Sequence, residues 1–328
     1  MSFVHVPFDP DRRSFKPPAT TTDPLFAYER HAVRVDNHLL DELETPNYRI
    51  RELAFPSVGE NGQEGNLVTA RYFQSKEPGR KPLVIVLPIW GTHEYPSDKT
   101  VSSFRKRSRG DISILALMGE DFLIDWPALA AARSESAFRS LADEMAERLV
   151  TTVIDIRRVI DWAEQQPDVD ASRIGLVAFS LGAVVGASVV TNEPRIAATV
   201  LVMGAVDAGK IFAHCDGRVA TVRQAVMPRF DWTLEEYEAV MDAAFAAGDA
   251  ANFPGRVDPA HALMIDSKND NCMPESTRDQ LWEVLGRPER ISFRYSHKQA
   301  FLAMTPLGFN FTSRRIFNFM NEQLAPKK

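Results

Sequence analysis

The chain has 328 residues, enough for one large domain or two smaller ones; 45% of them are hydrophobic and 25% are charged. These proportions are average for soluble globular proteins and exclude a mostly disordered chain. The formal net charge of −6 gives no support to nucleic-acid binding, and no apolar run approaches the ~20 residues of a membrane-spanning helix.

The N-terminal part differs in pattern from the rest of the chain. Residues 1–24 are rich in Pro, Asp and Thr and are expected to be irregular, and residues 24–44 have a weak helical pattern. Residues 48–56 and 66–73 are separated by a turn-rich stretch, which predicts an antiparallel pair of strands at a sheet edge. We therefore expect an arm and a helix over residues 1–45, ahead of the main domain.

Short unbroken apolar runs begin at residue 83 and recur as far as residue 295. Such runs are typical of strands that are buried on both faces, as in a parallel sheet. The segments between them have helical periodicity, clearest over residues 136–165, so helices are expected on both faces of the sheet. The predicted strands are residues 83–87, 112–117, 174–179, 197–203, 262–265 and 291–295.

One connection is longer than a sheet crossover requires. More than fifty residues separate Met203, near the end of one predicted strand, from Ala262, near the start of the next. They include a helix predicted over residues 233–247, with Thr233 as N-cap and Glu236 three residues later. Because long connections in compact domains are usually functional, we expect a helical cap over a pocket at about residues 208–257.

Ser180 lies in the run RIGLVAFSLGAVVG, residues 173–186, between a predicted strand and a segment of small residues. A tight strand–turn–helix junction pushes the side chain at its apex out above the sheet. The residues two before and two after must then be small, and Ala178 and Gly182 meet this requirement. The position also places the hydroxyl at a helix N-terminus, where the amide of Leu181 favours negative charge.

This junction resembles the nucleophile elbow of the α/β-hydrolase superfamily, usually G-x-S-x-G, with Ala178 in place of the first glycine. The wider run IDWAEQQPDVDASRIGLVAFSLGA, residues 160–183, resembles the dienelactone-hydrolase and prolyl-oligopeptidase-like esterase branch. The resemblance covers about residues 48–324. It implies an α/β-hydrolase domain over residues 46–328, with a mostly parallel central sheet and the cap as an insertion.

A serine nucleophile needs a base and an acid that orients the base, and in this superfamily the chain order is Ser, acid, His. His297 follows the last predicted strand, as the superfamily's histidine would. His214 falls in the cap and His261 lies before a strand, so neither is favoured. Asp270, in the loop after the strand at 262–265, resembles the superfamily's acid.

Two other carboxylates compete with this acid. Asp207 follows the preceding strand, and Asp266 lies at the end of the strand itself. The second oxyanion amide is expected in the loop after residue 87, which reads PIWGTHEYP. By position the backbone N–H of Trp90 is favoured there, with Ile89 next to it, and the amide of Leu181 is the first donor.

The sequence thus predicts a serine carboxylic-ester hydrolase with Ser180, His297 and Asp270 as a catalytic triad, acting through an acyl-enzyme. The expected partner is a small-molecule ester, and the oligomeric state is left open, a homo-oligomer included. An amidase, peptidase or thioesterase would use the same residues, and a non-catalytic ligand-binding protein on this scaffold is the alternative from another class.

No cofactor or metal is expected, since the sequence has no GxGxxG, P-loop or HExxH motif. Cys215 and Cys272 are too few for a disulfide framework and do not form a CxxC pair. The first residues, MSFVHVPFDPDRR, lack the basic and apolar segments of a signal peptide. We therefore expect a soluble, cytoplasmic protein with no nucleic-acid or membrane partner.

Overall fold

The computed structural model describes residues 2–10, 15–16, 18–19, 21–30, 35–58, 67–89, 95–119 and 123–326. These residues form a ten-stranded sheet in the order β1-β10-β9-β8-β7-β5-β6-β4-β3-β2. The strands are β1 (Phe3–Val6), β2 (Asp36–Leu39), β3 (Tyr48–Pro56), β4 (Leu67–Ser75), β5 (Lys81–Val86), β6 (Ser113–Leu117), β7 (Val169–Phe179), β8 (Ile196–Val202), β9 (Ala262–Ser267) and β10 (Glu289–Phe293).

Six central strands, β6, β5, β7, β8, β9 and β10, are parallel to one another. They correspond to the six predicted apolar runs, and their central residues are buried on both faces. The expected antiparallel pair is also confirmed, because β3 pairs with β4 from Tyr48 opposite Ser75 to Pro56 opposite Leu67. The sheet is therefore mixed, with a parallel centre and antiparallel strands toward its edges.

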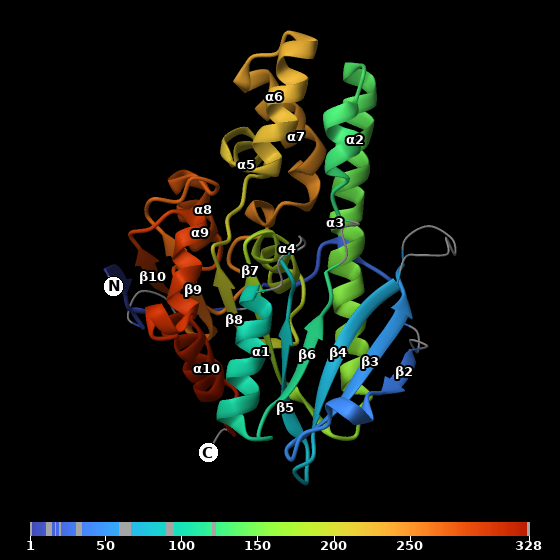
Figure 1. Cartoon of the computed structure of the whole chain (residues 1–328), viewed down its shortest axis with the longest axis vertical. Coiled ribbons are helices and arrows are strands. Elements are labelled where there is room, and N and C mark those ends of the chain that lie inside the picture. The colour runs from blue at the N-terminus through green and yellow to red at the C-terminus, as the bar shows by residue number, and fades with distance from the viewer. Residues whose placement is uncertain are drawn as a thin grey trace.

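Helices cover both faces of the sheet (Figure 1). The apolar sides of α1 and α10 pack on one face, and α3, α4 and α8 contribute to the core on the other. The predicted helix over residues 136–165 is confirmed as the long helix α3. The helices are α1 (Tyr95–Ser108), α2 (Trp126–Ala131), α3 (Glu135–Glu164), α4 (Leu181–Val190), α5 (Ala208–His214), α6 (Arg218–Phe230), α7 (Leu234–Phe245), α8 (Glu275–Val284), α9 (His297–Ala300) and α10 (Phe311–Gln323).

The N-terminal segment differs from its prediction. Residues 3–6 form the edge strand β1, antiparallel to β10, and residues 36–39 form β2, antiparallel to β3. The expected helix over residues 24–44 is wrong for the described part of that segment, which has two 3-10 turns and this strand. Pairing at the sheet edge satisfies the backbone N–H and C=O groups of these two strands. Between them, fully buried Phe26 packs against Phe253, with ring centroids 5.8 Å apart.

The long connection between β8 and β9 forms three helices, α5, α6 and α7, which stand above one end of the sheet beside α2 and the first turns of α3 (Figure 1). The predicted helix in this region is confirmed as α7, and Thr233 and Glu236 make the expected capping box.

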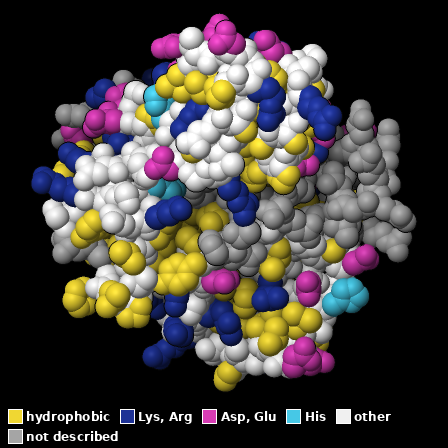
Figure 2. Space-filling model, turned by 45° about the horizontal axis from the view of Figure 1, so that its top comes forward, with side chains coloured by type: hydrophobic (Ala, Val, Ile, Leu, Met, Phe, Trp, Pro, Cys, Tyr) yellow, Lys and Arg dark blue, Asp and Glu magenta, His cyan; other side chains and the backbone are white. Residues whose placement is uncertain are grey.

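Among the described residues, no helix combines the length and apolarity needed to cross a membrane. With this end turned toward the viewer, hydrophobic side chains gather near the centre of the face, among basic ones (Figure 2).

Candidate active site

Ser180 lies at the junction between β7 and α4, in a backbone conformation that L-residues rarely adopt, with φ 51° and ψ −123°. Its N–H donates a hydrogen bond to the carbonyl of Val202 on the neighbouring strand β8, at 2.9 Å. The small residues after it let α4 lie against β7, since a Cβ on Gly186 would come within 2.9 Å of the Cβ of Ala178. The junction therefore has the sharp turn that the sequence predicts.

The structure brings Ser180, His297 and Asp270 into one hydrogen-bonded chain. The Ser180 Oγ and the His297 Nε2 are 2.9 Å apart. On the other side of the imidazole ring, Nδ1 is 2.8 Å from one carboxylate oxygen of Asp270 and 3.0 Å from the other. Since the imidazole contacts a hydroxyl through one nitrogen and a carboxylate through the other, it is placed to take a proton from the hydroxyl while the carboxylate fixes its tautomer.

The loop after β9 holds the Asp270 carboxylate in place. Its Oδ1 accepts hydrogen bonds from the backbone N–H groups of Cys272 and Met273, both at 2.8 Å. The next residue, Asn271, accepts the backbone N–H of His297 through its Oδ1 at 3.2 Å. The Asp270 side chain is 0% exposed, so the imidazole and these amides replace water around the charge.

The competing carboxylates bind other partners. Asp266 is buried and pairs with two arginines: its Oδ2 is 2.5 Å from the Nη2 of Arg290 and 3.4 Å from the Nη1 of Arg278. Asp207 caps the N-terminus of α5 and pairs with the side chain of Lys210. The two side chains are thus held by structural contacts, whereas Asp270 contacts His297.

The other histidines that follow Ser180 in the chain also have contacts elsewhere. His214, in the cap, lies 3.7 Å from a carboxylate oxygen of Glu238, and His261 hydrogen bonds to the side chain of Gln323.

The oxyanion donors are only partly described. Leu181 is the first residue of α4, and an amide at this position has no carbonyl partner within its own helix. Trp90, predicted to supply the second amide, lies outside the described residues, but its neighbour Ile89 lines the same cavity as Ser180 and Leu181. Leu181 therefore has the expected position, and the role of Trp90 stays a prediction.

A cavity of about 260 Å³ lies beside the Ser180 hydroxyl. Its lining is mainly apolar and comes from the sheet loops, from α2 and α3, and from the cap. Trp126 and Met145 line it from α2 and α3, and Phe212 and Phe245 line it from the cap.

The aromatic residues of the cap differ in whether they line this cavity. Phe245 reaches the cavity, but Tyr237 and Trp232 pack instead on Phe138, with ring centroids 5.9 Å and 5.5 Å away. Sequence reasoning missed Phe212, for which the only available signal is its position in the short helix that opens the cap.

Two buried or partly buried carboxylates anchor the start of the cap. Asp249 accepts the backbone N–H groups of Asp207 and Ala208, at 2.8 and 3.2 Å. Asp242 accepts the N–H of Gly209 at 3.0 Å, and a Cβ on this glycine would come within 1.9 Å of the same oxygen. Burial, followed by the nearby charge of Asp207, raises the pKa of Asp242 to about 6.

A disulfide joins Cys215, at the end of α5, to Cys272, in the loop that bears Asp270. Both residues line the cavity beside Ser180. The side chain of Asn271 adds a hydrogen bond to Asp216, so the loop that bears Asp270 contacts the cap through two neighbouring residues. The sequence, read as too poor in cysteine for a disulfide framework, gave no sign of this single bond, because the residues are 57 positions apart.

Comparison with known proteins gives two kinds of match. The family model described as "BAAT / Acyl-CoA thioester hydrolase C terminal" matches residues 157–283, which include the Ser180 junction and the loop that bears Asp270. In a search of curated proteins, no sequence match was found.

Solved structures match over most of the chain. An acetyl xylan esterase from Paenibacillus sp. R4 is 17% identical, with a TM-score of 0.67 over 93% of this chain and 96% of that one. Acetyl xylan esterase 1 from Thermoanaerobacterium sp. JW/SL YS485 is 16% identical, with a TM-score of 0.65 over 90% and 89%. An acylaminoacyl peptidase from Pyrococcus horikoshii is 13% identical, with a TM-score of 0.56, and covers 88% of this chain and 43% of that one.

The predicted fold is confirmed: the chain has the α/β-hydrolase fold. In this fold the serine, the acid and the histidine follow one another along the chain. Here they come at the junction after β7, in the loop after β9 and after β10. At these levels of identity the solved structures establish the fold, and the activity has to be argued from the site.

Proposed function

We propose that the protein is a serine hydrolase that cleaves a carboxylic ester through an acyl-enzyme intermediate. The observation that carries this proposal is the hydrogen-bonded chain from the Ser180 hydroxyl through His297 to Asp270, beside an apolar cavity. A hydroxyl is a weak nucleophile at neutral pH unless a base takes its proton, and these contacts supply the base and its orienting acid.

In the proposed reaction the Ser180 Oγ attacks the ester carbonyl and its proton passes to the His297 Nε2. The negative charge on the carbonyl oxygen is stabilised by the amides of Leu181 and Trp90 at the start of α4 and in the loop after β5. The imidazolium, stabilised by Asp270, gives the proton to the departing alcohol. Water then attacks the acyl-serine in the same way, and the acid product leaves without any cofactor.

A thioester is the second candidate substrate, and the family-model match over residues 157–283 favours it. The same residues and steps serve both substrates, with a thiol in place of the alcohol as the leaving group. We name the ester first because the two acetyl xylan esterases, which share the fold along nearly the whole chain, are named as ester hydrolases, and the rates compared below decide between the two substrates.

The first test is covalent labelling with a fluorophosphonate, because an activated hydroxyl beside an oxyanion site reacts with tetrahedral phosphorus. Intact-mass analysis should show one adduct, and peptide mapping should locate it on Ser180. Ser188 is the matched control, since it lies in the same helix and hydrogen bonds to the Gly248 carbonyl. Folded protein that takes no label would support the non-catalytic binding protein instead, and a label on another serine would show that Ser180 is not the nucleophile.

The second test separates the substrates. Initial rates are measured with p-nitrophenyl esters, with an acyl-thioester and with an anilide of the same acyl group. The proposal expects the highest kcat/KM with the ester. A thioester preference of tenfold or more would identify a thioesterase, and preference for the anilide would identify an amidase.

A further inference from the structure

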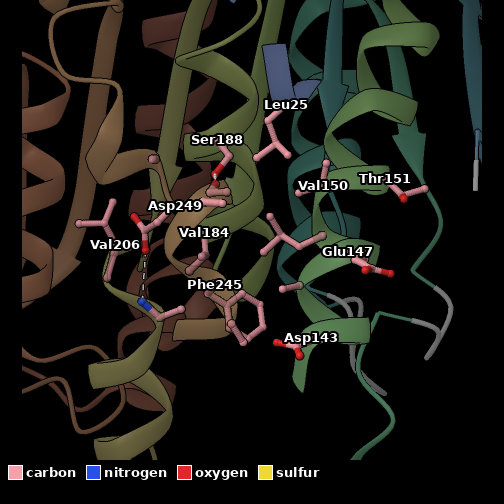
Figure 3. Close-up of a pocket in the computed structure, with 18 residues that line it drawn as sticks. Leu25, Asp143, Glu147, Val150, Thr151, Val184, Ser188, Val206, Phe245 and Asp249 are labelled. Atoms are coloured by element: carbon pink, nitrogen blue, oxygen red, sulfur yellow. Dashed lines mark hydrogen bonds between the residues drawn. The ribbon is translucent and has the colours of Figure 1, made fainter. Parts of the chain in front are cut away.

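A second cavity, of about 520 Å³, lies between α3, α4 and α7 (Figure 3). Val150 on α3, Val184 on α4 and Phe245 on α7 give it an apolar interior, while Asp143 and Glu147 on α3 are exposed. The catalytic chain described above does not use this space. It lies beside the cavity at Ser180.

The two cavities share a wall. Four residues line both of them, and each comes from a different helix around the site. They are Leu149 of α3, Val184 of α4, Ala208 of α5 and Phe245 of α7.

Phe245 is the largest of these side chains and is 6% exposed. Its ring stacks on that of Phe212, with centroids 5.5 Å apart and planes at 23°. Phe212 lines the cavity at Ser180 and not the second one, so the ring of Phe245 is held against that side of the wall. This ring is therefore the bulkiest group that lines both cavities.

We propose that Phe245 limits the length of the acyl chain that the enzyme accepts, by closing the cavity at Ser180 against the second cavity. The inference rests on the proposed ester hydrolysis. The acyl carbon must bond to the Ser180 Oγ, and the apolar cavity beside that atom buries the chain attached to it. An acyl chain that outgrows this cavity meets the shared wall, and the space beyond is accessible only without the ring.

The test is a series of p-nitrophenyl esters from acetate to decanoate, measured with the wild type and with Phe245→Ala. The variant should raise the ratio of kcat/KM for octanoate to that for acetate by at least about tenfold, since even one methylene in an apolar pocket is worth that much. A parallel series of acetates with different alcohols should keep its wild-type order. Tyr237→Leu is the control, because Tyr237 is buried on the same helix and lines neither cavity.

A double variant tests whether the second cavity receives the chain. Ala244 lines that cavity and not the one at Ser180. Adding Ala244→Phe to Phe245→Ala should fill the space beyond the wall, return the octanoate-to-acetate ratio toward the wild-type value and leave acetate hydrolysis unchanged.

The outcomes separate the two proposals. If the wild type hydrolyses no ester and takes no fluorophosphonate label, the proposed function fails. If it hydrolyses esters but Phe245→Ala and the milder Phe245→Leu both keep the wild-type ratio, the role of Phe245 is wrong. An equal change in Tyr237→Leu would also overturn it, because loosening of the cap would then explain the effect.

Discussion

The two sides of the cavity hold their residues by different means. On the sheet side, the backbone positions Ser180 and Asp270: a strained turn presents the hydroxyl, and two amides hold the carboxylate. On the cap side, Phe212 is positioned by packing on Phe245 and on Trp126 of α2. Backbone contacts define the geometry within tenths of an ångström, whereas apolar packing tolerates replacement by side chains of similar volume.

This difference predicts which substitutions change the rate of the reaction and which change the preference among substrates. Changes on the sheet side should lower the rate for every substrate, because the geometry of proton transfer is lost. Changes on the cap side should alter the preference among substrates and leave the chemistry intact.

The largest effect is expected for Ser180→Ala. Without the hydroxyl no acyl-enzyme forms, and the rate should fall on the order of a million-fold, as in serine proteases that lose a triad residue. Stopped assays with high enzyme concentration measure the residual kcat/KM. Ser188→Ala should retain most of the activity, and comparable rates for the two variants would contradict the assignment of the nucleophile.

Asp270→Asn should follow, with a loss on the order of ten-thousand-fold in kcat and little loss of folding, because the amide selects the wrong imidazole tautomer. Asp207→Asn should keep most of its activity.

Asp266→Asn should instead lower the free energy of unfolding, by about 3–5 kcal/mol, since it weakens a buried pair with Arg290 and Arg278. Circular dichroism and kcat together separate the three variants. A folded, inactive Asp207→Asn beside an active Asp270→Asn would move the acid to the preceding strand.

The disulfide connects the two sides, so its loss tests whether they are independent. Replacing Cys215 and Cys272 by Ala removes the covalent link between the cap and the loop that bears Asp270 and leaves the hydrogen bond between Asn271 and Asp216. It should lower kcat roughly tenfold, since small displacements of catalytic groups are costly. KM should change as well, because both residues line the cavity. Wild type treated with reductant should behave like the double variant, which should itself be insensitive. Full activity of wild type with two titrated free thiols would show that the link is dispensable.

The smallest effect concerns the pH dependence of the cap. The pKa of Asp242 is raised to about 6, so the folded state binds this proton more tightly than the unfolded chain does. The contribution of Asp242 to stability is therefore present below about pH 4 and is lost as the pH rises through about 6. Asp242→Asn should remove this dependence, which is measured as a flatter urea midpoint between pH 4 and 7. If the urea midpoint of the variant depends on pH as steeply as that of the wild type, Asp242 is not the source of this dependence.

Much of the sheet side was predictable from sequence because its signals are local. Unbroken apolar runs mark strands buried on both faces, and small residues around Ser180 mark a tight junction where a helix must approach a strand. Order along the chain then singled out His297 among the later histidines. The capping box of α7 is equally local, and it predicted that helix within two residues of each end.

Local sequence patterns therefore predict the parallel sheet, the positions of Ser180 and His297, and the presence of a cap, since each depends on residues close together in the chain. The tertiary structure is needed to show that Asp270 meets His297 while Asp266 meets two arginines, because Asp266 is still within β9 whereas Asp270 lies in the loop beyond it, and their partners come from other parts of the chain. It also decided the pairing of the edge strands, the disulfide and the wall at Phe245. These join residues far apart in the sequence, and no local pattern records which distant partners packing brings together.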